Sequence, residues 1–191
     1  MEPIAIDVRD LVRRNVASLY SHLVTRPTGR AVRLAIEAQL GEHLGDPKRP
    51  VLSTIDLSEV AVLDYSCADE VVAKLLTRYR KADRPFEVFF VFRTIDVHHL
   101  ETLEEVLRRQ RLTALVEASG GDFALVGALS EDARALWHQL DGGGSLRGGA
   151  LAEVRGRQAE ALQSLMEERL LLELDGGREL STLANLARRL R

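Results

Sequence analysis

The chain has 191 residues, of which 46% are hydrophobic and 29% are charged, and its formal net charge is −3. This length allows one large domain or two small ones, and the hydrophobic share is sufficient to build a core. A net charge this close to neutral does not by itself indicate a nucleic acid, a membrane surface or an acidic partner.

Cys67 is the only cysteine, which excludes an intrachain disulfide and a zinc site built on cysteines. The N-terminal segment reaches charged residues too early for a signal peptide, and no run of about 18 apolar residues predicts a membrane span. We therefore expect a cytoplasmic protein without a membrane partner.

Helix and strand patterns alternate from the N-terminus. Residues 3–25 are ambiguous and predict either a strand followed by a helix or a small hairpin. Apolar residues four apart then predict a helix that begins at about Thr28 and ends before the Gly45-Asp46-Pro47 stop. A buried strand is expected at 51–57, and the apolar residues 60–63 either continue this strand or form a short neighbouring one.

The alternation continues to residue 127. Residues 67–83 predict a helix whose last turn carries basic side chains that complement its dipole. The segment 86–92, FEVFFVF, is typical of the centre of a sheet that is covered on both faces. A helix at 94–112 and two short strands around Gly120-Gly121 are expected next. This pattern predicts an α/β domain over residues 1–127, with helices on a mainly parallel sheet.

From Ser130 onward the helical pattern predominates. A helix with Ser130 as its N-cap is expected to stop at the glycines 142–144, and two further helices are expected, a short one over 146–156 and a longer one over 157–174. A hairpin with an Asp175-Gly176-Gly177 turn comes next. This order of elements resembles that of winged-helix modules and implies a small α+β winged-helix domain over residues 128–191.

The segment VLSTIDLSEVAVLDYSCADEVVAKLL, residues 51–76, resembles the STAS family of anti-sigma-factor antagonists. It is more closely similar to the STAS-like domain of unknown function. The shared features are an acidic residue near a strand end, here Asp56, a short apolar run, a hydroxyl-rich turn and a helix. The upstream segment 25–40 also resembles the first helix of that group. The resemblance covers about residues 5–127 and implies a mixed sheet with helices.

In anti-sigma-factor antagonists the residue after the turn aspartate is the phosphorylated serine. Here Tyr65 occupies that position, Ser66 matches a second hydroxyl position, and Cys67 stands where those proteins carry glycine. The resemblance implies that this turn docks a partner or acts as a phosphorylation switch. The candidate residues are Asp64, Tyr65, Ser66, Cys67, Asp69 and Glu70.

Two interpretations of Ser66 stay open. A phosphate on Ser66 would lie at a helix N-terminus, which favours an anion, and its charge would repel a partner. Alternatively, Ser66 only caps the helix, with Asp69 three residues later in a capping-box position. The carboxylates near Cys67 raise the pKa of its thiol and so disfavour a reactive thiolate. We therefore expect Cys67 to be a small buried cysteine with a structural role.

The sequence contains no residue pattern that is typical of a metal site or of a catalytic site. His98 and His99 are adjacent, and adjacent helical side chains point about 100° apart and make a poor chelate, so a solvated helix start is expected there. The chain has no P-loop, no dinucleotide-binding glycine motif and no nucleophile–base pair. We expect no cofactor and no enzymatic activity, and a small enzyme that uses Ser66 or Cys67 is the least favoured alternative.

A winged helix that reads DNA needs basic residues on its third helix and its hairpin. Residues 128–191 contain nine arginines and ten acidic residues, which is a weak electrostatic footprint. The candidate DNA contacts are Arg155, Arg157, Gln158, Gln163, Arg169, Arg178, Arg188 and Arg189.

The leading hypothesis is a non-enzymatic regulatory or adaptor protein. Its STAS-like domain would dock a protein partner, and its winged-helix domain would bind DNA or a second protein. By analogy with the STAS family, the partner would be a kinase-like ATP-binding protein. The alternative is a DNA-binding transcription regulator whose N-terminal domain senses a signal or dimerises. Formation of a homo-oligomer stays open.

Overall fold

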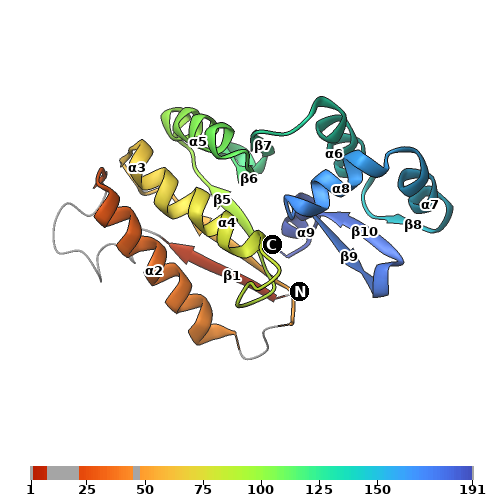
Figure 1. Ribbon diagram of the computed structural model, residues 1–191, viewed down its shortest axis with the longest axis horizontal. Coiled ribbons are helices and arrows are strands. Elements are labelled where there is room, and N and C mark those ends of the chain that lie inside the picture. Colours follow the sequence, from red (N-terminus) through yellow and green to blue (C-terminus); the bar gives the residue numbers. More distant parts are fainter. Residues whose placement is uncertain (1, 8–21, 45–47, 191) are drawn as a thin grey trace. The chain divides into compact units, whose positions relative to one another are not determined.

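The structure is a computed structural model that describes residues 2–7, 22–44 and 48–190 (Figure 1). Its internal contacts divide the chain into two compact units, residues 1–128 and 129–191. The expectations for residues 8–21 and for the 45–47 stop lie outside the described residues. Among the described helices, none has both the length and the hydrophobicity to cross a lipid bilayer.

The first unit is built on a five-stranded mixed sheet with the strand order β1-β3-β5-β6-β7. The first four strands in this order run parallel, and the last is antiparallel to its neighbour. The expected central strand is β5, which lies in the middle of the sheet, and the expected α/β class is confirmed. The strands are β1 (Glu2–Asp7), β3 (Val51–Asp56), β5 (Val88–Arg93), β6 (Thr113–Glu117) and β7 (Phe123–Gly127).

Helices connect the parallel strands. They are α2 (Arg26–His43), α3 (Tyr65–Ala68), a π-helical turn (Asp69–Ala73), α4 (Lys74–Arg80) and α5 (Val97–Gln110). The chain stays helical from α3 through the π-helical turn into α4, and we call residues 65–80 the central helix. A separate two-stranded ladder joins β2 (His22–Leu23) to β4 (Val62–Leu63), so the apolar residues 60–63 contribute a short neighbouring strand.

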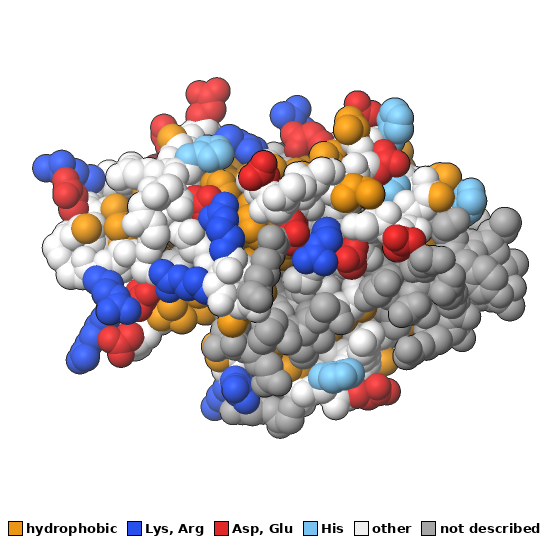
Figure 2. Space-filling model, turned by 180° about the vertical axis from the view of Figure 1, so that it is seen from behind, with side chains coloured by type: hydrophobic (Ala, Val, Ile, Leu, Met, Phe, Trp, Pro, Cys, Tyr) orange, Lys and Arg blue, Asp and Glu red, His pale blue; other side chains and the backbone are white. Residues whose placement is uncertain are grey.

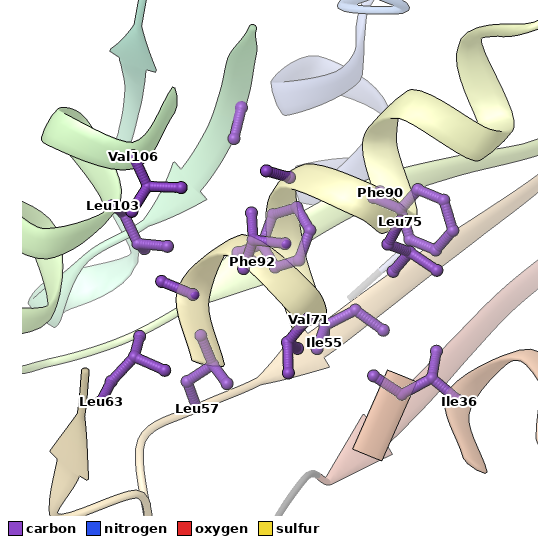
Figure 3. Close-up of a cluster of buried hydrophobic side chains, with 14 of the residues drawn as sticks. Ile36, Ile55, Leu57, Leu63, Val71, Leu75, Phe90, Phe92, Leu103 and Val106 are labelled. Atoms are coloured by element: carbon purple, nitrogen blue, oxygen red, sulfur yellow. The ribbon is translucent and has the colours of Figure 1, made fainter. Parts of the chain in front are cut away.

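The hydrophobic core lies between these helices and one face of the sheet. Figure 3 shows side chains from α2, the central helix and α5 gathered around those of β3 and β5. This arrangement explains the helical and alternating spacing of the apolar residues. The labelled side chains that meet there include Ile36, Val71, Leu75, Leu103 and Val106 from the helices and Ile55, Phe90 and Phe92 from the strands.

A glycine lets α2 lie very close to the central helix. A Cβ atom added to Gly29 would lie 2.9 Å from the Cα atom of Cys67 and 3.0 Å from the Cβ atom of Glu70. Distances below about 3 Å between such atoms require the backbones to separate, so a larger residue at position 29 would push the helices apart. Gly29 therefore fixes where the first residues of α2 meet the turn at residues 64–70.

The second unit combines helices with a three-stranded antiparallel sheet of order β8-β10-β9. The expected helices and the hairpin are present, but the longer of the two later helices ends at Glu167, because Leu171–Leu174 form the first strand of the hairpin. The Ser130 hydroxyl caps α6 by accepting a hydrogen bond from the Ala133 N–H (3.2 Å). The structure adds β8 and a terminal helix. The elements are α6 (Glu131–Gly143), β8 (Leu146–Arg147), α7 (Gly148–Arg157), α8 (Ala159–Glu167), β9 (Leu171–Leu174), β10 (Glu179–Thr182) and α9 (Leu183–Arg189).

Candidate functional site

The turn at residues 64–70 begins the central helix, and Asp64 is its N-cap. One carboxylate oxygen of Asp64 accepts hydrogen bonds from the Cys67 N–H (2.8 Å) and from the Ser66 hydroxyl (2.9 Å). The interpretation of Ser66 as the N-cap is therefore wrong, and Ser66 lies inside the first helical turn. Aspartate caps as well as serine does, and its charge also complements the helix dipole, so the helix begins earlier than expected.

Cys67 lies on the inner side of the central helix and is fully buried. Its thiol donates a hydrogen bond to the carbonyl oxygen of Thr25 (2.9 Å). Burial, together with the nearby charge of Asp64, raises the pKa of the Cys67 thiol to about 11. The expected small buried cysteine is confirmed, and this thiol is a poor nucleophile at neutral pH.

Glu70 is buried on the π-helical turn and faces three cations. Its carboxylate lies 3.1 Å from Arg26 Nη1 and 3.7 Å from Arg33 Nε, and it also pairs with Lys74. Burial acts to raise the pKa of Glu70, but the hydrogen bonds from Lys74 and Arg26 and the charge of Arg33 outweigh it and hold this pKa below its ordinary value. The charged Glu70 therefore holds α2 against the central helix.

Asp69 connects three helices on the outer side of the same turn. Its carboxylate accepts hydrogen bonds from Arg26 Nη1 of α2 (2.7 Å) and from Gln110 Nε2 of α5 (3.0 Å). A cavity of about 210 Å³ opens beside these contacts. Its lining consists of Arg26, Tyr65, Ser66, Asp69, Val106, Arg109 and Gln110.

The structure thus separates the turn candidates into two groups. Tyr65, Ser66 and Asp69 line the cavity, whereas Cys67 and Glu70 point inward and are not accessible to a partner. Arg26 and Arg109 are not among the sequence candidates. Each is one of many arginines on an amphipathic helix, so no local pattern distinguishes it.

Exposed apolar side chains lie around the start of the central helix. Their exposed fractions range from 39% for Val62 to 64% for Val97. The segments that carry them are neighbours, because β2 pairs with β4 and α5 packs against both β4 and α3. In Figure 2, hydrophobic side chains reach the surface beside acidic and histidine side chains. We call this set the apolar strip, which consists of Val24, Val62, Tyr65, Ile95 and Val97.

Asp56, which contributes to the STAS resemblance, belongs to a ladder of charges across three strands. Arg93 Nη1 lies 3.0 Å from Asp56, and Arg93 Nη2 lies 3.1 Å from Glu117. Burial acts to raise the pKa of Asp56, but hydrogen bonds from Ser58 and Arg93 outweigh it and keep this pKa below its ordinary value. The ladder joins β3, β5 and β6, and Arg93 pairs with both carboxylates through its two Nη atoms, although its Nε atom has no hydrogen bond within the described residues.

The two adjacent histidines lie in different environments. The His98 side chain is 88% exposed, whereas His99 is only 2% exposed and forms a hydrogen bond with the Thr94 hydroxyl (3.0 Å). The expected solvated helix start is therefore right for His98 and wrong for His99, because a rotation of about 100° turns the second ring to the core face. Within the described ranges, no three His, Cys, Asp or Glu side chains lie close enough together to hold a metal ion.

Most of the arginines proposed as DNA contacts already face carboxylates. The pairs are Arg155–Glu173 (2.8 Å), Arg157–Glu153 (2.6 Å), Arg188–Asp141 (2.8 Å) and Arg189–Glu179 (3.9 Å). Arg178, directly after the hairpin turn, is exposed and forms no ion pair with any residue that the structure describes. These pairings lower the positive potential that a DNA backbone would meet.

The third helix of the second unit, α8, also presents an acidic surface. Glu160, Gln163 and Glu167 are exposed on it, and the Gln163 amide donates a hydrogen bond to Glu167 (2.8 Å). Gln158 lies at the junction of α7 and α8, and Arg169 lies after α8 with a left-handed φ of 58°. The eight candidates thus spread over α7, α8, the residue Arg169 after it, the hairpin and α9.

Comparison of the chain with protein-family models, with curated proteins and with solved structures finds no match. The geometry of the two units is therefore the basis for the function proposed below.

Proposed function

We propose that this chain is a regulatory adaptor protein without catalytic activity, in which the first unit is a STAS-like domain that docks a protein partner. The second unit would be a winged-helix domain that binds another protein. The order of the elements in each unit supports these two fold assignments. The observation that carries the docking function is the apolar strip at the start of the central helix.

The composition of the strip suits protein recognition. An exposed tyrosine beside aliphatic side chains is typical of an interface centre, and burial of apolar surface contributes about 25 cal/mol per Å². Acidic side chains border the strip in the sequence at Glu59, Asp64 and Asp96. The complementary partner therefore has an apolar patch with a basic rim. A kinase-like ATP-binding protein is the specific candidate that the STAS resemblance suggests.

The same turn offers a way to regulate docking. Tyr65 belongs to the strip and Ser66 lines the adjacent cavity, so a phosphate on either hydroxyl would place negative charge next to the apolar contact surface. A hydrolytic role for these residues has no comparable support. The Ser66 hydroxyl is directed to Asp64 by its hydrogen bond, and the Cys67 thiol is buried with a raised pKa.

Site-specific crosslinking in cells tests the docking function. A photo-crosslinking residue at Val97 identifies the partner, whose affinity is then measured with purified proteins. We expect the Val62→Ser/Ile95→Ser variant to lose roughly tenfold or more in affinity. Leu34, an exposed apolar residue of α2 outside the strip, supplies a control with the same kind of substitution, Leu34→Ser. Equal affinities of the strip variant and the wild type would contradict the proposal.

A second candidate function is DNA binding by the second unit. It is favoured by the exposed Arg178 next to the hairpin turn, where a winged helix contacts the DNA backbone. The test is binding of the full chain to fragmented genomic DNA at low and at physiological salt. Sequence-selective binding that survives physiological salt and weakens in Arg178→Ala would support a transcription regulator. Absence of binding at both salt concentrations would leave the protein-binding function.

A further inference from the structure

A second surface of the first unit runs between the central helix and the C-terminal part of α5. It consists of the cavity of about 210 Å³ beside Asp69 and a further cavity of about 350 Å³. Gln110 lines both cavities, so the two are adjacent along the same pair of helices. The second cavity is lined by Thr77, Arg80, Lys81, Gln110 and Leu112, and we call both cavities together the basic groove.

Helical periodicity explains how one groove arises from residues far apart in the sequence. Ser66, Asp69 and Thr77 follow one another at multiples of three or four along the central helix and share one stripe of it, and Lys81 directly follows the end of this helix. The fifteen steps from Ser66 to Lys81 correspond to about 22 Å at 1.5 Å per residue. An extended peptide of about seven residues has the same length.

The floor of the groove is apolar. Val106 of α5 and Leu112 just after it contribute to the lining although each is largely buried. Polar groups that can form hydrogen bonds lie beside them, from Thr77 and Gln110. A ligand of mixed apolar and polar character matches this lining better than a uniformly charged one.

The charges of the groove are mainly positive. Four basic side chains line the two cavities, against one carboxylate, Asp69, which already pairs with Arg26. Arg109 and Lys81 are both exposed, and neither forms an ion pair with a residue in the described part of the chain. Their charges are therefore available to a ligand, in contrast to most arginines of the second unit.

We propose that the basic groove binds an acidic peptide segment of a partner protein, with its carboxylates at Arg109 and Lys81 and its apolar side chains over Val106 and Leu112. This second docking surface shares Tyr65 with the apolar strip but differs from it in charge preference, and none of the residues assigned here to the peptide belongs to the strip. A nucleic acid fits less well, because its evenly spaced phosphates would also meet the carboxylate of Asp69.

A random peptide library selected against the full-length protein provides the probe. We expect enrichment of peptides that alternate acidic and apolar residues. Fluorescence anisotropy then compares the best labelled peptide on the wild type, on Arg109→Glu/Lys81→Glu, and on the charge-matched control Arg178→Glu/Arg157→Glu at two exposed positions of the second unit. The groove variant should lose roughly tenfold or more in affinity, whereas the control should bind as the wild type does.

Three outcomes would overturn the proposal: enrichment of peptides without acidic residues, retained affinity in the groove variant, or equal losses in both variants. A single-stranded homopolymeric RNA is measured in parallel, and tighter binding of the RNA through Arg109 and Lys81 would also overturn it. The strip variant Val62→Ser/Ile95→Ser should still bind the acidic peptide. This measurement separates a failure of the groove from a failure of the strip.

Discussion

A buried glutamate holds neighbouring elements together in each unit, but the two glutamates do so in different surroundings. The side chain of Glu70 is 3% exposed and that of Glu179 is 8% exposed. Glu179 lies in a regular strand and pairs with Arg147 of β8 and Arg189 of α9. A hydrogen bond from Ser145, followed by one from Arg147, keeps the pKa of Glu179 below its ordinary value.

Glu70 instead lies on a π-helical turn, where the N–H of Lys74 bonds to the carbonyl of Asp69 five residues earlier. One of its carboxylate oxygens has no hydrogen bond in the described part of the chain, although Arg33 Nε lies 3.7 Å away. Irregular turns and imperfectly satisfied buried groups are frequent near functional sites. Glu70 has both an irregular turn and an oxygen without a hydrogen bond, whereas Glu179 lies in a regular strand. This difference favours the first unit as the location of the functional site, because the turn of Glu70 lies beside the strip and the groove.

Among the substitutions considered for stability, Glu70→Gln is expected to lower the free energy of unfolding most. This change removes the charge that three cations share and should lower the free energy of unfolding by about 2 kcal/mol, less than for a fully buried pair because Arg26 and Lys74 regain water. Urea denaturation measures the loss. Glu179→Gln is the counterpart in the second unit. A larger shift of the urea midpoint in Glu179→Gln than in Glu70→Gln would contradict the expectation that Glu70 stabilises the chain more than Glu179 does.

The same pair of variants gives a pH dependence. The pKa of Glu70 is lowered in the folded state, so its contribution to stability is present at neutral pH and is lost as the pH falls through the ordinary carboxyl range to the lower pKa of the folded state. Glu70→Gln should flatten this part of the curve of unfolding free energy against pH. An unchanged curve would show that Glu70 has the same pKa in the folded and unfolded chains.

The next largest loss of stability is expected at Gly29, where α2 lies close to the central helix and so brings Arg26 to the turn at residues 64–70. Gly29→Ala should destabilise the chain by about 1–2 kcal/mol, because the added methyl group overlaps Cys67 and Glu70 and this outweighs the higher helix propensity of alanine. Gly41, in the same helix, provides the control, since its added Cβ would lie 4.0 Å from Phe86. Gly41→Ala should stabilise the chain by up to about 1 kcal/mol, and a similar gain in Gly29→Ala would contradict the tight contact.

These glycines illustrate which features the sequence could predict. Apolar periodicity located the helices, the central strand β5 and the hairpin, because burial of one face leaves a regular pattern. The patterns of α2 and of residues 67–83 do not distinguish Gly29 from Gly41, since the contact depends on how two helices cross. Arg26 and Arg109 reach the turn from other helices for the same reason. The cap was misassigned because Asp64 and Ser66 are both good capping residues.

A smaller effect, on the pH dependence of stability, is expected from His99 of α5, and its neighbour His98 serves as the control. Burial lowers the pKa of His99, while the charge of Asp96 opposes this shift and that of His98 adds to it. Because the unfolded chain takes up a proton first, the stability that depends on neutral His99 is lost as the pH falls below about 6.5. His99→Gln should reduce this loss in urea midpoints measured across that range. His98→Gln, at an exposed position, should leave it unchanged, and equal effects would contradict the buried environment of His99.

The smallest effect is expected from a surface pair of the second unit. Arg157 and Glu153 lie one turn apart on α7, and their side chains are 79% and 57% exposed. Such pairs gain little because water and salt screen them, so Arg157→Ala should change the free energy of unfolding by no more than about 0.5 kcal/mol. Added salt should reduce this difference further. A loss above about 1 kcal/mol would mean that Arg157 stabilises the α7–α8 junction by packing, and the contrast between the buried charge of Glu70 and the surface pairs of the second unit would then be weaker.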